Sequence, residues 1–268
     1  MPVHLDLPSE HEHVAIVTLD RPEAANSLDP TMLAELAAAW RRIAGDESIR
    51  CAVLTGRGDV FCAGMDMKRT IPSARRLAEG ERISDEEFEG LRSVSTALLA
   101  GFDLRTPLVC AINGAARAGG FDLMLASELR FAAPSATFAL EEVALGLYPT
   151  GNATVLLPRQ IGWARAQQLL LTAEPIDADE ALGCGLVNAI LEPDRLLPRA
   201  LAVADRIAAN APLAVRATRA GVRELLTMPL PEAYRRQEEL GRPLRQTEDA
   251  REAQRAFVEK RRPRFVGR

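Results

Sequence analysis

Residues 112–133 read INGAARAGGFDLMLASELRFAA. The apolar run at 108–112, which leads into this stretch, is typical of a buried strand. The small residues from Gly114 to Gly120 indicate a loop whose backbone another group can approach closely, and we expect a short helix to start at its end. A further strand is expected at 129–132. This order of strand, loop, helix and strand indicates an α/β fold.

A second loop of this kind occurs at residues 61–66, which read FCAGMD. It follows an expected buried strand at 49–54. Backbone amides at such loops and at the start of a helix are free hydrogen-bond donors near the positive end of the helix dipole. Two loops directed at one oxygen would form an oxyanion hole. The alternative for either loop alone is that its glycines only permit a turn and close packing.

Strand and helix patterns alternate along most of the chain and then give way to helices alone. This change predicts an α/β body over residues 1–195 and an all-helical region over 196–268. The helices expected in the second region are richer in Ala and Leu than a surface helix requires, which indicates subunit packing. Residues 70–90 are polar and indicate an irregular segment.

Two helix starts carry capping signals. Asp29 followed by Pro30 predicts a helix that runs to Gly45, because aspartate is a favoured N-cap and proline suits the first helical position. Ser84 with Glu87 predicts a capping box at the start of a later helix.

Composition excludes several classes of function. The net charge of −4 and the pI of about 5.6 give no sign of a nucleic-acid binder. The four cysteines are too far apart for a paired zinc or redox motif. All three histidines lie at the N-terminus, so neither a Ser-His-Asp device nor a histidine metal site is expected; they are His4, His11 and His13. Acid–base chemistry must then come from Asp, Glu, Tyr, Lys or water.

The chain has no run of about 18 apolar residues and no basic and apolar blocks of a signal peptide. These patterns predict a cytoplasmic protein with reduced thiols and no membrane span.

Several segments, in their order along the chain, resemble the crotonase superfamily, the enoyl-CoA hydratase/isomerase family. The resemblance implies a crotonase-like spiral of ββα units with a C-terminal helical oligomerisation region. It also implies an acyl-CoA thioester substrate, no required cofactor or metal, and assembly as a homotrimer or a dimer of trimers. The matching segments are LDRPEAANSL at 19–28, FCAGMDMK at 61–68, the stretch at 112–133, FALEEVALGLYPTGNA at 138–153, AEPIDADEALGCGLVN at 173–188 and AFVEKRRPRF at 256–265.

The resemblance implies that the amides of Ala63 and Gly119 form the oxyanion hole. The run at 118–120 reads Ala-Gly-Gly and departs from the family's GGG-like run at Ala118 only. A coenzyme A track is implied as well. Its expected residues are Ala24, Asp66 and Met67 through backbone contacts, and Phe257 and Lys260 from the tail, often that of a neighbouring subunit.

Hydratases of this family use two glutamates around one water. The second matches Glu142, which we favour over Glu141 because Phe138 and Gly146 fix the phase of the match. The first position is occupied by Asp122, which is shorter by one carbon–carbon bond of about 1.5 Å. The alternative for Asp122 is that it only stabilises the positive end of the helix.

Hydration of a 2-trans-enoyl-CoA to a 3-hydroxyacyl-CoA is the leading hypothesis, with the thioester oxygen between the two amides. One alternative is a shift of the double bond from position 3 to position 2, for which Glu142 alone would suffice. Another is a catalytically silent acyl-CoA binder. Dehalogenation is disfavoured because Thr150 lies in the stretch where such relatives carry an aspartate nucleophile.

Overall fold

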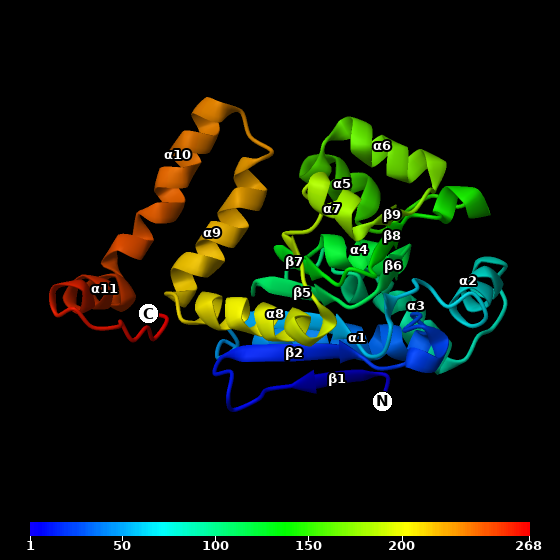
Figure 1. Ribbon diagram of the computed structural model, residues 1–268, viewed down its shortest axis with the longest axis horizontal. Coiled ribbons are helices and arrows are strands. Elements are labelled where there is room, and N and C mark those ends of the chain that lie inside the picture. The colour runs from blue at the N-terminus through cyan, green and yellow to red at the C-terminus, as the bar shows by residue number, and fades with distance from the viewer.

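The computed structural model describes all residues from 1 to 268, and Figure 1 shows how they are arranged. The strands are β1 (Val3–Asp6), β2 (Val14–Leu19), β3 (Cys51–Gly56), β4 (Val60–Cys62), β5 (Leu108–Ile112), β6 (Ala115–Arg117), β7 (Leu129–Ala132), β8 (Thr137–Ala139), β9 (Ile176–Asp177) and β10 (Ala189–Ile190). The α-helices are α1 (Pro30–Gly45), α2 (Thr70–Ala78), α3 (Asp85–Ala97), α4 (Gly119–Leu125), α5 (Ala153–Ile161), α6 (Trp163–Thr172), α7 (Ala178–Gly183), α8 (Pro193–Ala208), α9 (Pro212–Leu225), α10 (Leu230–Gly241) and α11 (Glu248–Val258). Short 3₁₀ turns are η1 (Pro22–Ala24), η2 (Glu142–Leu145) and η3 (Pro243–Gln246).

The larger sheet has the strand order β1-β2-β3-β5-β7-β10, and all its neighbours are parallel except β1 and β2. Both faces of this sheet are covered, which explains why β3 is apolar without alternation. Cys51 and Val53 pack in one cluster with α8, whereas Ala52 and Leu54 belong to the main core on the other face with α1 and α4.

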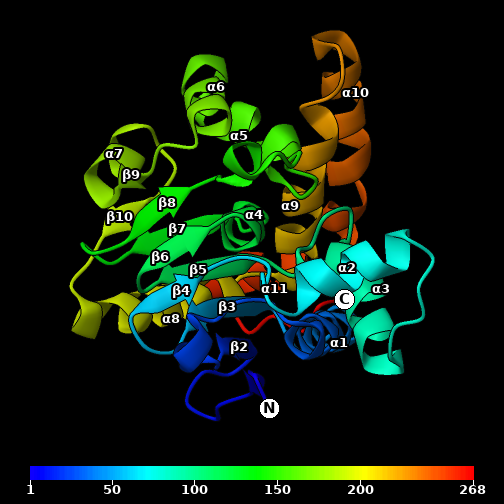
Figure 2. The ribbon, with the colours of Figure 1, turned by 90° about the vertical axis from the view of Figure 1, so that its right-hand side faces the viewer.

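The smaller sheet has the order β4-β6-β8-β9, and β4, β6 and β8 are parallel (Figure 2). Each of β3, β5 and β7 lies in the large sheet, and the strand that follows it in the chain lies in the small one. The expected spiral of ββα units is therefore confirmed. Because neighbouring parallel strands end at the same edge, the segments after β4, β6 and β8 come together there.

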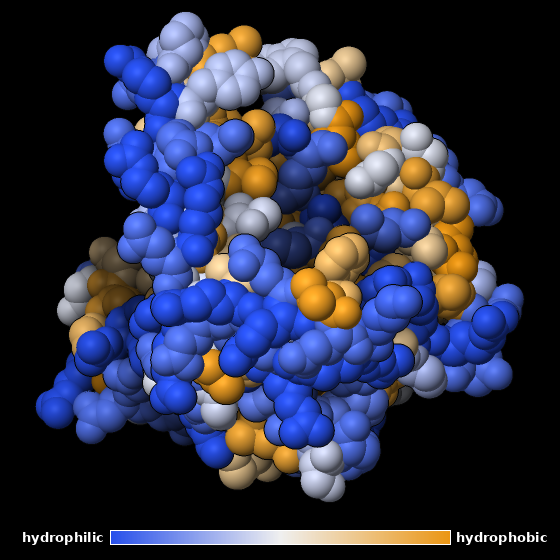
Figure 3. Space-filling model, turned by 90° about the vertical axis from the view of Figure 1, so that its left-hand side faces the viewer, coloured by the Kyte–Doolittle hydropathy of each residue, from blue (hydrophilic) through white to orange (hydrophobic).

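The C-terminal helices separate from the sheets only after α8. The division predicted at residue 195 falls inside α8, and this helix buries Leu196, Ala200 and Ala204 against the large sheet. Helices α9 and α10 then rise as a hairpin beside the α/β layers, and α11 lies beyond them at the left of Figure 1. Figure 3 faces this side and shows hydrophobic atoms gathered around a recess that is bordered by hydrophilic ones. None of the helices combines the length and the apolar character needed to cross a bilayer.

The predicted helix caps are confirmed, and one expectation for the loops is wrong. The Asp29 side chain accepts a hydrogen bond from the Met32 amide, and Ser84 forms the complete capping box. Residues 70–90 were expected to be irregular, yet they contain α2. The Asp66 carboxylate accepts hydrogen bonds from the Lys68 and Arg69 amides and so holds the turn that leads into this helix. The Asp66 carbonyl oxygen accepts from the Thr70 and Ile71 amides and so satisfies the first two donors of the helix.

Helices α1 and α3 pack closely because a glycine separates them. A Cβ atom built on Gly90 of α3 would lie 2.4 Å from Cα and 2.5 Å from the carbonyl oxygen of Pro30, at the start of α1. Backbone atoms cannot give way as a flexible side chain does, so the two helices can approach this closely only because residue 90 has no side chain.

We predict that Gly90→Ala destabilises the protein by about 1–3 kcal/mol, because overpacking outweighs the roughly 1 kcal/mol by which alanine favours a helix over glycine. Urea unfolding followed by circular dichroism measures this difference. Gly45→Ala is the matched control, since a Cβ there meets nothing within 4 Å. A Gly90→Ala variant as stable as that control would contradict the packing argument.

Candidate active site

A cavity of about 550 Å³ opens beside the first turn of α4. Its walls come from the segments that follow β4, β6 and β8, together with α2 and α3. Most of the lining is apolar, including Met67, Ile71, Val94, Leu98 and Leu147. Three carboxyl groups line the same cavity, and no lysine, arginine or histidine does.

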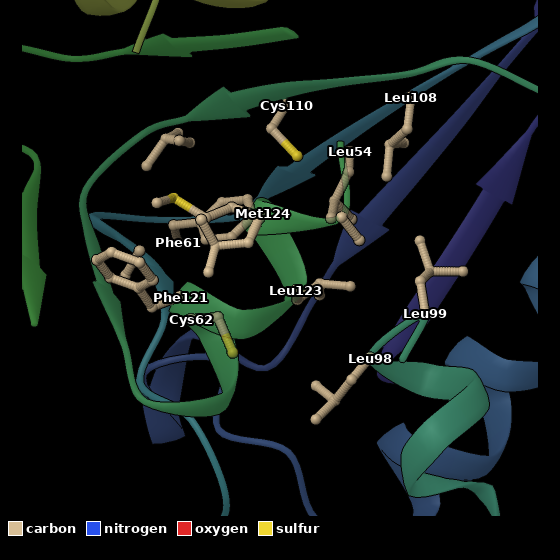
Figure 4. Packing of buried hydrophobic residues seen from close by; sticks show 14 of the residues in the cluster. Leu54, Phe61, Cys62, Leu98, Leu99, Leu108, Cys110, Phe121, Leu123 and Met124 are labelled. Carbon is tan, nitrogen blue, oxygen red and sulfur yellow. The ribbon is translucent and has the colours of Figure 1, made fainter. Parts of the chain in front are cut away.

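Two glycines allow the loop after β4 to lie directly against the start of α4. A Cβ atom on Gly120 would lie 2.3 Å from the Cys62 carbonyl oxygen, so no side chain fits there. Gly64 has φ +87°, and a Cβ atom there would lie 3.1 Å from the Gly119 amide nitrogen. The residue of α4 after Gly120, Phe121, packs edge-on against Phe138 with 6.3 Å between ring centroids. Figure 4 shows the buried side chains gathered around α4.

Met65 and Gly119 line this cavity, and their backbone amides have no acceptor in the chain. The sequence predicted Ala63 in place of Met65, and that prediction is wrong. The Ala63 amide donates to the Ala25 carbonyl oxygen at 3.0 Å and is therefore occupied. Residues 25–28 run beside residues 63–66, with Leu28 paired to Met65. In this pairing the amide of Met65 donates to no group of the chain and can therefore bind a substrate oxygen.

Ala118, the departure from the family pattern, has a strained backbone. Its φ of 44° and ψ of −117° lie in a region that glycine adopts far more easily than alanine. Its amide donates to the Ala139 carbonyl oxygen at 3.0 Å, and its carbonyl oxygen accepts from the Asp122 amide at 2.9 Å. These two bonds hold the turn that leaves the next amide, that of Gly119, free. Strain of this kind is commonly found where a loop serves a function.

Asp122 is buried in the first turn of α4 and is held by the start of α5. Its Oδ1 accepts hydrogen bonds from the amides of Asn152 and Ala153, each at 2.6 Å. Its Oδ2 receives no hydrogen bond from the chain, although the residue lines the cavity. Burial raises the pKa of Asp122 to about 6, and the charge of Glu142 acts in the same direction, while the two amides oppose the rise.

Glu142 begins η2, directly after β8. Its Oε2 is buried and has no hydrogen-bond partner. Burial raises the pKa of Glu142, and the charge of Glu141 adds to this rise. The Glu141 carboxylate is instead bound by Arg117, at 3.1 Å. This difference favours Glu142 over Glu141 as the carboxyl group available for proton transfer.

The side chain of Asp66 has a structural role. Its Oδ2 accepts from Arg21 at 2.7 Å, and its backbone amide and carbonyl are bound by Leu28, Thr70 and Ile71. Burial acts to raise the pKa of Asp66, but the hydrogen bonds from Arg21 and from two backbone amides outweigh it and lower the pKa. Every polar group of Asp66 therefore has a partner in the chain, and its contact with the coenzyme stays a prediction.

The other four predicted coenzyme residues are dispersed. Met67 is 55% exposed and lines the cavity, with an amide that has no acceptor in the chain. Ala24 is partly exposed in η1, and its amide donates to the Arg21 carbonyl oxygen. Phe257 and Lys260 lie at the exposed end of α11 and do not line the cavity. In Figure 1, α11 lies at the opposite end of the molecule from α2.

Sequence reasoning missed Arg21, Gly151 and Asn152. Asn152 is buried, and its side chain donates to the backbone carbonyl oxygens of Leu98 and Asp122 at 2.8 and 2.9 Å. A buried asparagine normally satisfies backbone groups of other segments, but its burial cannot be read from the Gly-Asn sequence, so the signal was weak. Its partners also lie 54 and 30 residues away in the sequence.

Comparison with known proteins gives consistent matches over the whole chain. The family model described as enoyl-CoA hydratase/isomerase matches residues 9–268. The enoyl-CoA hydratase EchA19 of Mycobacterium tuberculosis is 40% identical over 96% of this chain and 94% of its own. The (E)-benzylidenesuccinyl-CoA hydratase of Thauera aromatica is 41% identical over the full length of both. The crystal structure of an enoyl-CoA hydratase from Bacillus anthracis superposes with a TM-score of 0.89, at 32% identity and full coverage of both chains.

The raised pKa of Asp122 predicts a pH-dependent stability. An unfolded aspartate has a pKa near 3.9, whereas the folded value is about 6, so between these values the folded protein binds more protons. The free energy of unfolding should therefore fall as pH rises from about 4 to about 6, by up to about 3 kcal/mol in all. Asp122→Asn keeps an acceptor for the two amides and should remove this dependence of the free energy of unfolding on pH. Urea unfolding at several pH values measures both proteins, and a constant difference between them would contradict the assignment.

Proposed function

We propose that this chain, which belongs to the enoyl-CoA hydratase/isomerase family, adds water to a 2-trans-enoyl-CoA to give the 3-hydroxyacyl-CoA. One observation carries this proposal. Two carboxylate oxygens without donors, Asp122 Oδ2 and Glu142 Oε2, and two amides without acceptors, those of Met65 and Gly119, belong to the lining of one cavity. Such a site can stabilise an enolate and move protons beside it.

The thioester oxygen is held by the amides of Met65 and Gly119. Negative charge develops on this oxygen when C3 is attacked, and donors fixed in advance stabilise that charge without reorganisation. The amide of Gly119 also lies at the first position of α4, where the helix dipole favours negative charge.

A water molecule between the two carboxyl groups supplies the atoms that are added. An ionised carboxylate accepts one proton from the water while its oxygen bonds to C3 and the electrons of the double bond move toward the thioester oxygen. A proton from a carboxyl group then bonds to C2, which completes the addition. This requires one ionised and one protonated group, and burial, which raises the pKa of both Asp122 and Glu142, favours keeping one of the two protonated.

A second reaction is favoured by the way Asp122 is held. Because its Oδ1 already accepts two amide hydrogen bonds, Asp122 has fewer free positions than Glu142 for binding water. Glu142 alone would then move a proton between C2 and C4 and shift a double bond from position 3 to position 2. This isomerase reaction uses the same oxyanion amides.

The acyl group that fits this cavity is apolar and uncharged. Apolar side chains form most of the wall, and the titratable groups in it are three acids and Tyr148. Arg117 is close but already bound to Glu141. An acyl group with a free carboxylate would place this negative charge in the cavity beside other acids and without a counter-ion. The substrate named for the Thauera aromatica relative, a succinyl derivative, would thus be disfavoured here.

Subunit association through α9, α10 and α11 into a trimer or a dimer of trimers is supported by exposed apolar side chains on this hairpin. Leu226, Leu230 and Tyr234 are 74%, 72% and 68% exposed. A cavity of about 280 Å³ between α9 and α10 is lined mainly by apolar residues and by no titratable group. Exposed apolar surface of this kind is typical of protein interfaces. In such an assembly Phe257 and Lys260 would reach the coenzyme bound to a neighbouring subunit.

We predict that Glu142→Ala lowers the hydration rate by at least about 100-fold and that Asp122→Ala lowers it as well, since each removes a proton-transfer group. Loss of absorbance of the conjugated enoyl thioester measures the rate with 2-enoyl-CoAs of increasing chain length. Glu141→Gln is the control and should stay within about tenfold of the parent, because its partner is Arg117.

No hydration at any chain length by the parent would exclude the hydratase. Conversion of 3-enoyl-CoAs by both the parent and Asp122→Ala would then establish the isomerase.

We predict that 2-hexenoyl-CoA is preferred by at least about 100-fold in kcat/KM over the analogue that carries a carboxylate on its last carbon, because that charge is unpaired in the cavity. Steady-state kinetics at neutral pH compares the two thioesters, which differ only at this group. Equal kcat/KM values would contradict the proposed acyl class.

A further inference from the structure

Gly151 lies where a side chain would occupy the space of the Asp122 carboxylate. A Cβ atom built on Gly151 would lie 2.2 Å from Oδ2, 2.3 Å from Cγ and 2.7 Å from Oδ1 of Asp122. Its φ is outside the left-handed region, so the backbone alone would accept other residues. Space for the carboxylate, rather than backbone freedom, therefore requires glycine here.

Asn152 binds Asp122 from the same side. Its amide donates to Oδ1 at 2.6 Å, and its side chain donates to the Asp122 backbone carbonyl oxygen at 2.9 Å. The same side chain also donates to the Leu98 carbonyl oxygen, at 2.8 Å, which fixes the start of α5 relative to the end of α3. One buried residue thus holds both the backbone and the carboxylate of Asp122.

We propose that Gly151 and Asn152 are positioning residues that let an aspartate serve at residue 122 by bringing the start of α5 against its carboxylate. The inference rests on the proposed function, because it assumes that Asp122 acts on the substrate or its water. The missing side chain at Gly151 and the amide hydrogen bonds to the Asp122 carboxylate depend on each other. The amides can reach the short side chain only if the backbone of residues 151–153 comes close, and the backbone can come close only if residue 151 has no side chain.

These contacts fix the orientation of the Asp122 carboxylate. With Oδ1 bound to two amides, rotation of the group would break two hydrogen bonds, so Oδ2 is kept as the oxygen without a partner in the chain. An added methyl group at residue 151 must displace the carboxylate or the start of α5 by about 1 Å, and a misplacement of that size costs on the order of 100-fold in rate.

A double-mutant cycle tests this role. Gly151→Ala should lower kcat by about 100-fold and leave KM within about threefold, because the oxyanion amides are not moved. In an Asp122→Ala background, the same substitution should lower kcat by less than about threefold, because no carboxylate remains to be displaced. Gly183→Ala is the matched control, since a Cβ there meets nothing within 4 Å. Equal losses in the two backgrounds, or no loss in the parent background, would overturn the proposal.

A second readout does not depend on turnover. Carbon-13 NMR of labelled aspartate carboxyls, with the Asp122 signal assigned by its absence in Asp122→Asn, gives the titration midpoint of this group. Gly151→Ala should change that midpoint, because it separates the carboxylate from its amide donors. Asn152→Ala, which keeps the amide and loses the side-chain bonds, should change it too and serves if Gly151→Ala does not fold.

The two readouts separate the two proposals. A changed midpoint in a parent that hydrates no thioester would reject the proposed function and keep the positioning role. An unchanged midpoint in both variants would reject the positioning role, whatever the activity of the parent.

Discussion

The rest of the site depends on a contact between backbones that tolerates no side chain. At Gly120 and Gly64 the end of β4 and the start of α4 approach so closely that a methyl group would collide with backbone atoms. This contact brings two loops that are far apart in the sequence into one position. It also fixes where α4 begins, and thereby where the first turn carries Asp122. Close-packed interiors transmit such a constraint because neighbouring groups have little room to adjust.

The small parallel sheet gathers the chemical groups. Free backbone amides follow β4 and β6, and a carboxyl group follows β8, since the three strands are neighbours and end at one edge. The same arrangement buries Asp122 and half-buries Glu142, and burial raises the pKa of each. The fold therefore brings two carboxyl groups with raised pKa values and two free backbone amides into the lining of one cavity.

Sequence patterns predicted the features that depend on nearby residues. The caps formed by Asp29 and Ser84 and the succession of ββα units were accessible because a cap or a strand period is a local signal. The patterns missed interactions of groups whose partners are distant. The amide of Ala63 is bound by a segment nearly forty residues earlier, and Asp66 is bound by Arg21, 45 residues away. No spacing rule identifies such partners, so a candidate donor proved to be occupied and the structural role of the Asp66 side chain was not predicted.

The free amides and the carboxyl groups of the cavity come from different segments of the chain. The free amides of Met65 and Gly119 come from the loop after β4 and from the start of α4, whereas Glu142 and the anchor of Asp122 come from the single segment between β8 and the start of α5. Substitutions confined to that segment can change or move the carboxyl groups while the two free amides stay in place. Divergence of this scaffold toward new reactions is therefore expected to accumulate in residues 141–153, with the glycine contact at α4 left intact.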